Sequence, residues 1–122
     1  SNLQVSYEFI DKNNTMISVG SLDYELKPIP AQFALQDNYP NPFNPSTTIR
    51  YDIPNDAFIN IAIYDIAGRE IARPISMLQS AGYHSAVWNG TNQKGEMQAA
   101  GIYFYQIQTK DFVQTKKMLL LK

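Results

Sequence analysis

The side chains that could support catalysis in this 122-residue sequence are few and lie far apart. The absence of cysteine excludes disulfides, cysteine-ligated zinc, iron–sulfur clusters and thiol nucleophiles. The one histidine, His84, has no serine and aspartate at a spacing that would indicate a catalytic triad. Asp52, Asp56 and Asp65 lie on three different segments, so no glycosidase-type pair of carboxylates is predicted.

The loop Asn89–Glu96 is rich in oxygen-bearing side chains. A calcium loop of the EF-hand type needs alternating Asp or Asn, a central Gly and a terminal Glu. Glu96 is the only acidic residue here, and the ammonium group of Lys94 would repel a cation. The sequence therefore predicts a turn at this loop, and predicts neither an enzyme nor a metal or cofactor site.

Trp88 is the only tryptophan, and we expect it to anchor the core or its rim. The alternative is that the chain is an immunoglobulin-like carbohydrate-binding or adhesive module of a secreted enzyme. Such a module would need an exposed row of aromatic side chains, for which Trp88, Tyr83 and Tyr103 are the candidates.

The composition is that of a folded domain rather than a disordered chain. Hydrophobic residues make up 44% of the sequence and charged residues 17%, whereas disordered chains are more charged and less apolar. The length suffices to bury a core without disulfides or a structural metal. A net charge of −1 argues against bulk nucleic-acid binding. The charge is uneven, because residues 1–61 carry 3 basic and 7 acidic side chains and residues 62–122 carry 7 and 4.

Alternation of apolar and polar residues predicts a series of short strands separated by turn residues. They are Thr47–Ile53, Phe58–Asp65, Glu70–Ile75, Gly82–Trp88, Gly101–Thr109 and Phe112–Leu121. Only the short stretch Ile75–Gln79 has a helical preference. Alternation places Ile59, Ile61 and Ile63 on one face of their strand, and Tyr103, Tyr105 and Ile107 on one face of theirs. This spacing is typical of an antiparallel sandwich or barrel.

Residues 1–32 form a separate region, which we interpret as a hairpin and linker from the end of a preceding domain. Leu3, Val5, Tyr7 and Phe9 alternate with mostly polar residues before a turn at Asp11–Asn14. We expect this hairpin to pack on the sandwich or to pair with a neighbouring chain. The first residues lack the pattern of a signal peptide, and we expect the sequence to be a piece of a larger protein.

The segment Asn38–Ile49 contains three closely spaced prolines, which restrict the backbone to extended conformations. We interpret it as a stiff arm that crosses the mouth of the sandwich, with Tyr39 and Phe43 as aromatic anchors. A docking surface for a partner that recognises polyproline-like structure is the alternative.

This arm and the turns after it resemble the C-terminal sorting domain (type A) of the type IX secretion system, also called Por secretion, which Bacteroidota and related bacteria use. The matching segments are Phe33–Leu35, Asn38–Ile49, Tyr51, Ile53-Pro54, Ile63–Asp65, Gly68-Arg69, Ala81–His84, Val87–Gly90, Gly95, Ala100–Tyr105 and Thr115–Lys122. The Gly-Arg and Trp-Asn-Gly turns also resemble the immunoglobulin-like domain of a flagellar hook-capping protein. Asn89 stands where the sorting family usually has Asp.

The resemblance implies an all-β immunoglobulin-like sandwich of about seven antiparallel strands over residues 33–122. It implies a non-catalytic signal that directs a parent protein through the periplasm and across the outer membrane to the cell surface. The expected partners are the type IX machinery, a sortase-like surface protease and the upstream cargo domain. No nucleic-acid partner is expected.

The resemblance also assigns roles to individual residues. The residues expected to carry the sorting signal are Gly101, Tyr103, Thr115, Lys116, Lys117, Met118, Leu119, Leu120, Leu121 and Lys122. We expect the terminal strand to offer both a pairing edge and a patch of positive charge. The residues expected to hold the structure are Tyr39, Pro40, Asn41, Pro42, Phe43, Asn44, Pro45, Gly68, Trp88 and Gly90.

Overall fold

Seven strands form between the turn signals of the sequence in the computed structural model, which describes residues 29–121. They are β1 (Ala34–Leu35), β2 (Thr47–Ile53), β3 (Ala57–Tyr64), β4 (Glu70–Gln79), β5 (Gly82–Trp88), β6 (Gly101–Gln108) and β7 (Val113–Leu120). The hairpin predicted within residues 1–32 falls almost entirely outside the described residues, as does Lys122. The described part of the chain contains no helix long and apolar enough to cross a membrane.

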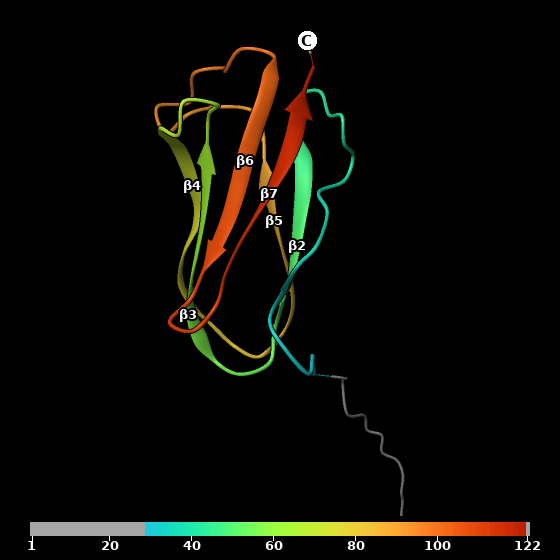
Figure 1. The fold of residues 1–122 in the computed structure, drawn as a ribbon, viewed down its shortest axis with the longest axis vertical. Coiled ribbons are helices and arrows are strands. Elements are labelled where there is room, and N and C mark those ends of the chain that lie inside the picture. The colour runs from blue at the N-terminus through green and yellow to red at the C-terminus, as the bar shows by residue number, and fades with distance from the viewer. Residues whose placement is uncertain (1–28, 122) are drawn as a thin grey trace, which may run out of the picture.

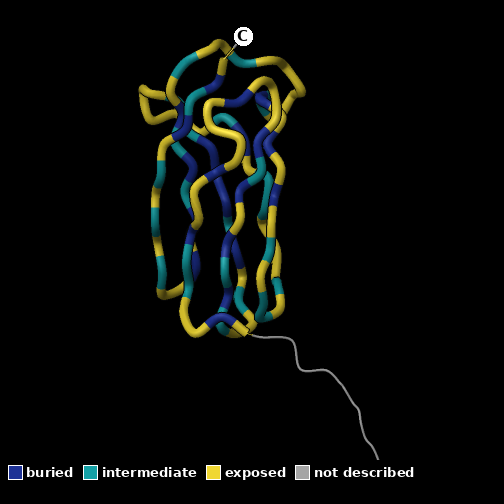
Figure 2. The backbone as a smooth tube through the Cα atoms, turned by 90° about the vertical axis from the view of Figure 1, so that its right-hand side faces the viewer, coloured by how far each residue is buried: buried dark blue, intermediate teal, exposed yellow. Residues whose placement is uncertain are grey.

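The strands form two antiparallel sheets that face each other (Figure 1). One sheet has the order β1-β2-β5, and the other has the order β4-β3-β6-β7. The predicted seven-stranded sandwich is therefore confirmed. β2 and β6 alternate between buried and less buried positions along their length, as expected when each sheet covers the core with one face only (Figure 2).

The core lies between the sheets and consists of the side chains that the alternation places on one face. Ile59, Ile61 and Ile63 of β3 are fully buried, and Tyr105 and Ile107 of β6 are buried opposite them in the same sheet. Residues on the outer face of these strands are mostly less buried, and Phe58 and Ile102 are exposed at 50% and 40%, although Ala62 is 4% exposed. The outer face of the larger sheet is thus apolar in places and is not covered by the described residues.

The stretch with helical preference, Ile75–Gln79, is part of β4 and not a helix. It pairs residue by residue with β3, from Ala57 opposite Gln79 to Ile61 opposite Ile75. Ladder hydrogen bonds and packing against β3 outweigh a weak local propensity. Pro74 lies on an edge strand, at the point where the register between β3 and β4 shifts. Because the pairing is already irregular there, the missing N–H of Pro74 removes no further hydrogen bond between these strands.

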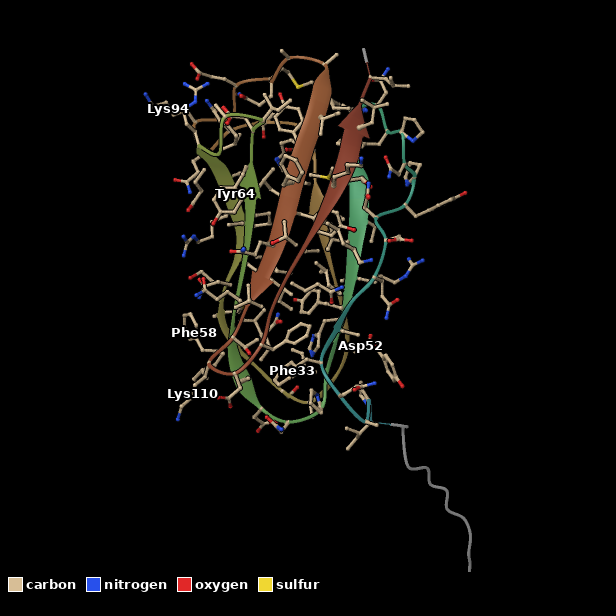
Figure 3. The ribbon with its side chains drawn as sticks, viewed as in Figure 1. Phe33, Asp52, Phe58, Tyr64, Lys94 and Lys110 are labelled. Carbon is tan, nitrogen blue, oxygen red and sulfur yellow. The ribbon has the colours of Figure 1, made fainter. Side chains whose placement is uncertain are left out.

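The end of the sandwich remote from the C-terminus is closed by aromatic stacking between two segments far apart in the sequence. Phe33, just before β1, stacks on Phe112, just before β7, with ring centroids 5.4 Å apart. Figure 3 shows Phe33 and the Lys110 turn at this end, whereas Lys94 lies at the opposite end. This contact fixes the start of β7 beside β1.

Candidate recognition surface

The proline arm, residues 39–46, connects the two sheets. The N–H of Tyr39 donates to the Thr48 carbonyl over 2.9 Å, and the N–H of Thr48 donates back over 2.8 Å. The arm then crosses to the last strand, where the N–H of Phe43 donates to the Leu119 carbonyl over 3.0 Å. The N–H of Leu121 donates to the Phe43 carbonyl over 2.8 Å. The arm therefore runs beside both β2 and the end of β7, as Figure 1 shows.

The two aromatic residues of the arm behave differently. Phe43 is 2% exposed and meets Trp88 edge-on at 5.7 Å, so the prediction that it anchors the arm is confirmed. Tyr39 is 69% exposed, and the prediction that its side chain is an anchor is wrong. Directly opposed residues of an antiparallel pair point to the same face, and Thr48 follows a buried residue, Thr47. Tyr39 therefore points outward, and it helps to hold the arm only through its backbone.

A buried hydrogen-bond network holds the root of the arm, residues 36–38, which lead into it. The Tyr105 hydroxyl accepts from the N–H of Asn38 over 2.9 Å and donates to the Gln36 carbonyl over 2.8 Å. The Asn38 amide donates to the Thr47 hydroxyl, which in turn donates to the Pro40 carbonyl. Burial is the main reason that the pKa of Tyr105 rises to about 12. Sequence reasoning missed the roles of Asn38 and Tyr105, because 67 residues separate them.

The arm contains cis peptide bonds before Pro40, Pro42 and Pro45. The other residues predicted to hold the structure include Gly68 and Gly90, which both have positive φ in turns. Gly68 has φ of +86° in the turn after β3, where the Asp65 carboxylate accepts from the N–H groups of Ala67 and Arg69. The hydrogen bond from the Arg69 N–H is the main cause that lowers the pKa of Asp65.

Alternation divides the predicted sorting residues into buried and accessible groups. Tyr103, Met118 and Leu120 are in the core, with exposures of 6%, 1% and 1%. The accessible or partly accessible positions are Gly101, Thr115, Lys116, Lys117, Leu119 and Leu121. A partner of the folded domain can therefore contact only the second group.

The predicted patch of positive charge does not form among the described residues. Lys116 and Lys117 are neighbours on a strand, so their side chains point to opposite faces. The Lys116 ammonium pairs with the Asp37 carboxylate at 3.0 Å, beside the root of the arm. Lys117 points to the outer face of the sheet and is exposed.

The predicted pairing edge is also partly occupied. β7 is one of the two edge strands of its sheet, and the arm pairs with its last residues. The N–H of Leu119 donates to the side-chain oxygen of Asn41 over 3.0 Å. Beside this junction lies an apolar pocket of about 320 Å³, lined by Asn41 and Pro42 of the arm and by Ile102, Lys117, Met118 and Leu119 of β6 and β7.

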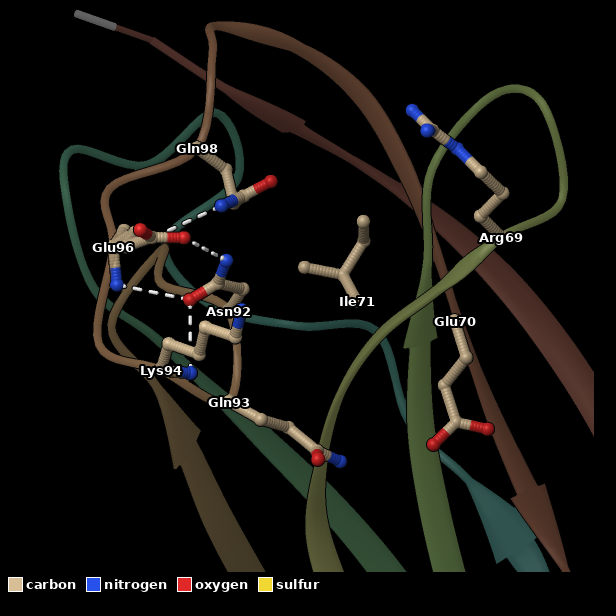
Figure 4. A pocket seen from close by; sticks show the side chains of 8 residues that line it. All are labelled: Arg69, Glu70, Ile71, Asn92, Gln93, Lys94, Glu96 and Gln98. Atoms are coloured by element: carbon tan, nitrogen blue, oxygen red, sulfur yellow. Dashed lines mark hydrogen bonds between the residues drawn. The ribbon is translucent and has the colours of Figure 1, made fainter.

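A second, polar pocket of about 450 Å³ lies at the turn that contains Asn92 (Figure 4). The Asn92 side-chain oxygen accepts from the N–H groups of Lys94 and Glu96, both over 2.9 Å, and its amide donates to the Glu96 carboxylate over 2.7 Å. The predicted turn is confirmed. No cluster of three or more His, Cys, Asp or Glu suited to a metal ion occurs within residues 29–121.

Of the residues considered for catalysis, Asp52 and His84 line one pocket of about 420 Å³, whereas Asp56 and Asp65 do not join them there. His84 is half-buried and stacks on Tyr51, with ring centroids 5.6 Å apart. Asp52 lies on β2, whereas Asp56 and Asp65 flank opposite ends of β3. Each of the three carboxylates accepts a hydrogen bond from a nearby backbone or side-chain group.

The exposed aromatic row that a carbohydrate-binding module would need is absent from the described part of the chain. Trp88 is 2% exposed and Tyr103 6%, with their rings 5.3 Å apart in the core. The Trp88 N–H donates to the Thr91 carbonyl over 2.8 Å. Tyr83 alone of the three candidates is exposed, at 62%. Trp88 and Tyr103 therefore cannot contribute to the row that the alternative requires, because these two large rings fill the gap between the sheets, and the prediction that Trp88 anchors the core is confirmed.

Residues 44–111 match the FlgD Ig-like domain family, a match that spans more than half of the chain. The chain belongs to this family. The resemblance of the turns at Gly68 and Trp88 to the immunoglobulin-like domain of a flagellar hook-capping protein is therefore confirmed. No curated protein matches the sequence.

Two solved structures from Porphyromonas gingivalis contain a similar fold. Dimeric latent PorU superposes with a TM-score of 0.60 at 21% identity, over 75% of this chain and 10% of that one. PorZ, an essential bacterial surface component of the type-IX secretion system, superposes with a TM-score of 0.51 at 20% identity, over 74% of this chain and 11% of that one. At this identity the likeness shows the fold. The FlgD Ig-like domain described here spans about a tenth of either protein.

Proposed function

We propose that this FlgD Ig-like domain is a non-catalytic C-terminal sorting signal of the type A class. It directs a parent protein through the type IX secretion system to the cell surface. The observation that carries the proposal is the junction between the arm and β7. The two most distinctive motifs of the sorting-domain resemblance, separated by more than 70 residues, form one hydrogen-bonded unit.

The similar domains in PorU and PorZ support this proposal, because PorZ is a surface component of that secretion system. The chain then passes through the periplasm, is recognised by the secretion machinery, and meets a sortase-like protease at the surface. We assign recognition to the accessible side chains Thr115, Lys117 and Leu121 rather than to the whole terminal strand.

No serine, threonine or cysteine among the described residues lines the pocket that Asp52 and His84 share, which supports a role without catalysis. A signal recognised by other proteins needs a stable shape and accessible side chains, and both are found at the junction. The apolar pocket beside Ile102 and Lys117 adds a concave element to that surface.

The test is export of the full-length parent from its own host. Deleting residues 115–122 is expected to leave the parent in the periplasm, with secretion reduced by about tenfold or more. Because this deletion removes most of β7 and unfolds the domain, Lys117→Glu is tested beside it, as an exposed change that preserves the core. Lys110→Glu, an exposed lysine at the opposite end of the sandwich, is the matched control.

Normal export of the truncated parent would contradict the proposal. Equal loss of export by Lys117→Glu and Lys110→Glu, with both domains folded by circular dichroism, would show that general surface charge and not the junction is recognised. Export of the Lys110→Glu variant at the wild-type level, with loss in the Lys117→Glu variant, is the expected result.

A further inference from the structure

We propose that the arm occupies the place of a partner's strand at the end of β7. The partner recognised there is an extended segment with one aromatic side chain, which binds when the arm swings away. The binding site follows from the contacts of the arm alone, whereas its use in secretion rests on the proposed function above.

The backbone contacts of the arm are those of an added strand. Phe43 forms a parallel bridge with Leu120, and the Phe43 N–H and carbonyl bond to Leu119 and Leu121 on either side of it. A peptide that adds to an exposed sheet edge makes the same main-chain bonds. The Asn41 side chain satisfies the one remaining outward N–H of this stretch, that of Leu119. An extended segment from another protein can make every one of these bonds.

The side-chain contact of the arm defines the chemistry of the partner. Phe43 inserts between the sheets and is 2% exposed, and its ring lies in a T-shaped contact with Trp88, with ring centroids 5.7 Å apart. Leu120, on the strand that Phe43 pairs with, is 1% exposed in the same core cluster. When Phe43 leaves, it uncovers an apolar hole of aromatic size next to an unpaired edge. An extended segment with an aromatic side chain fits both features.

The arm is held in a way that permits local opening. Phe43 is the only buried side chain of residues 39–46, and the other seven are exposed. The root of the arm is fastened separately, through Asn38 to Tyr105 and through Tyr39 to Thr48. Breaking the Phe43 contacts therefore releases the middle of the arm while both sheets and both attachments persist. While the arm is bound to the end of β7, it prevents that edge of the sheet from pairing with unrelated strands.

The first test adds the arm to the protein as a separate peptide. The probe is the blocked peptide Tyr-Pro-Asn-Pro-Phe-Asn-Pro-Ser, which has the sequence of residues 39–46. We expect it to bind the Phe43→Ala variant of the full chain at least about tenfold more tightly than wild type, because the wild-type arm competes for the site. The amide signals of Leu119 and Leu121 are expected to shift in NMR spectra. A peptide with Ala in place of Phe is the control and is expected to bind about tenfold more weakly.

Equal binding to wild type and variant, no dependence on the phenylalanine, or shifts confined to another face would each overturn the proposal. Native-state hydrogen exchange of the unaltered chain covers the case in which Phe43→Ala does not fold. The Leu121 amide, bonded to Phe43, is expected to exchange at least about 100-fold faster than the most protected amides of β3. Exchange of Leu121 only through global unfolding would overturn the proposal.

These outcomes are independent of export. Peptide exchange in vitro with normal export of the truncated parent would refute the sorting function and leave the binding site. If the peptide does not displace the arm and Leu121 exchanges only through global unfolding, while export of the Lys117→Glu parent is impaired, the proposal that a partner replaces the arm is refuted and the sorting function is not.

Discussion

The two halves of β7 lie in different surroundings, although the strand is continuous. In the first half, Val113–Lys117, the inward positions carry the polar side chains of Gln114 and Lys116, and no strand of residues 29–121 pairs with the outer edge. In the second half, Met118 and Leu120 are core residues and the arm pairs with the outer edge. A terminal strand can thus be secured at its end while its earlier half remains accessible. Stability and recognition are assigned to different residues of one strand.

The largest difference between the two halves is expected in the free energy of unfolding. Leu120→Ala removes a side chain that is 1% exposed, and the cavity should cost about 2–5 kcal/mol. Val113→Ala removes a side chain that is 55% exposed, and should change stability by less than about 0.5 kcal/mol. Chemical denaturation of both variants measures the difference. Similar costs would mean that the halves are equally important for stability.

Alkaline pH is expected to weaken the link between β6, the neighbour of β7, and the residues that precede the arm. Tyr105 lies opposite Lys116 in the ladder and bonds to Asn38, with the nearby Asp37 carboxylate opposing its ionisation. Its pKa is about 12 when folded and near 10 when unfolded, so the unfolded chain releases this proton first. The contribution of the protonated Tyr105 to the free energy of unfolding is therefore fully present below pH 10. It decreases by about 2 kcal/mol as the pH rises to 12.

The measurement is the free energy of unfolding between pH 8 and pH 12. Tyr51 and Tyr103 also have raised pKa values because of burial, and they contribute in the same direction. Tyr105→Phe is therefore compared with wild type, and only the difference between the two slopes is assigned to Tyr105. Parallel curves would contradict the assignment.

The strands could be predicted from the sequence because their pattern is local. Alternation with period two and the flanking turn residues gave the bounds of β2 and β5 to the residue, and located β6 and β7 within one residue at each end. β4 was predicted four residues too short, because Pro74 and the register shift beside it obscure the alternation. A bulge is a property of two paired strands and leaves a weak signal in either one.

The arm shows what the sequence alone could not reveal. Its stiffness followed from the spacing of the prolines, but its attachments depend on residues about 70 positions away. Nothing near Tyr39 indicates that its partner, Thr48, faces outward. The separation of Lys116 from Lys117 was predictable from alternation, whereas the ion pair of Lys116 with Asp37 required the packing of β1 beside β7.

A smaller effect is expected where the second half of β7 meets the turn at Gly90. A Cβ atom at Gly90 would lie 3.0 Å from the Pro45 carbonyl oxygen of the arm. Gly95 has a similar positive φ, but a Cβ atom there would meet nothing within 4 Å. Both substitutions by Ala carry the cost of a left-handed backbone, about 1 kcal/mol, and Gly90→Ala should cost about 1 kcal/mol more. Chemical denaturation gives both values. Faster exchange of the Leu121 amide in Gly90→Ala alone would locate the added cost in the arm, and equal effects would exclude it.

The smallest effect is expected in the first half, where the two adjacent lysines differ in their contacts. Lys116→Ala removes a partly exposed ion pair with Asp37 and should cost less than about 1 kcal/mol, and this cost should shrink in 1 M salt. Lys117→Ala removes no ion pair seen among the described residues and should cost about zero at either salt concentration. Thermal unfolding at low and high salt measures both. Because Lys117 has the negligible structural cost, a loss of export in its variants reports recognition, whereas a salt-dependent cost at Lys117 would show that it too has a structural partner.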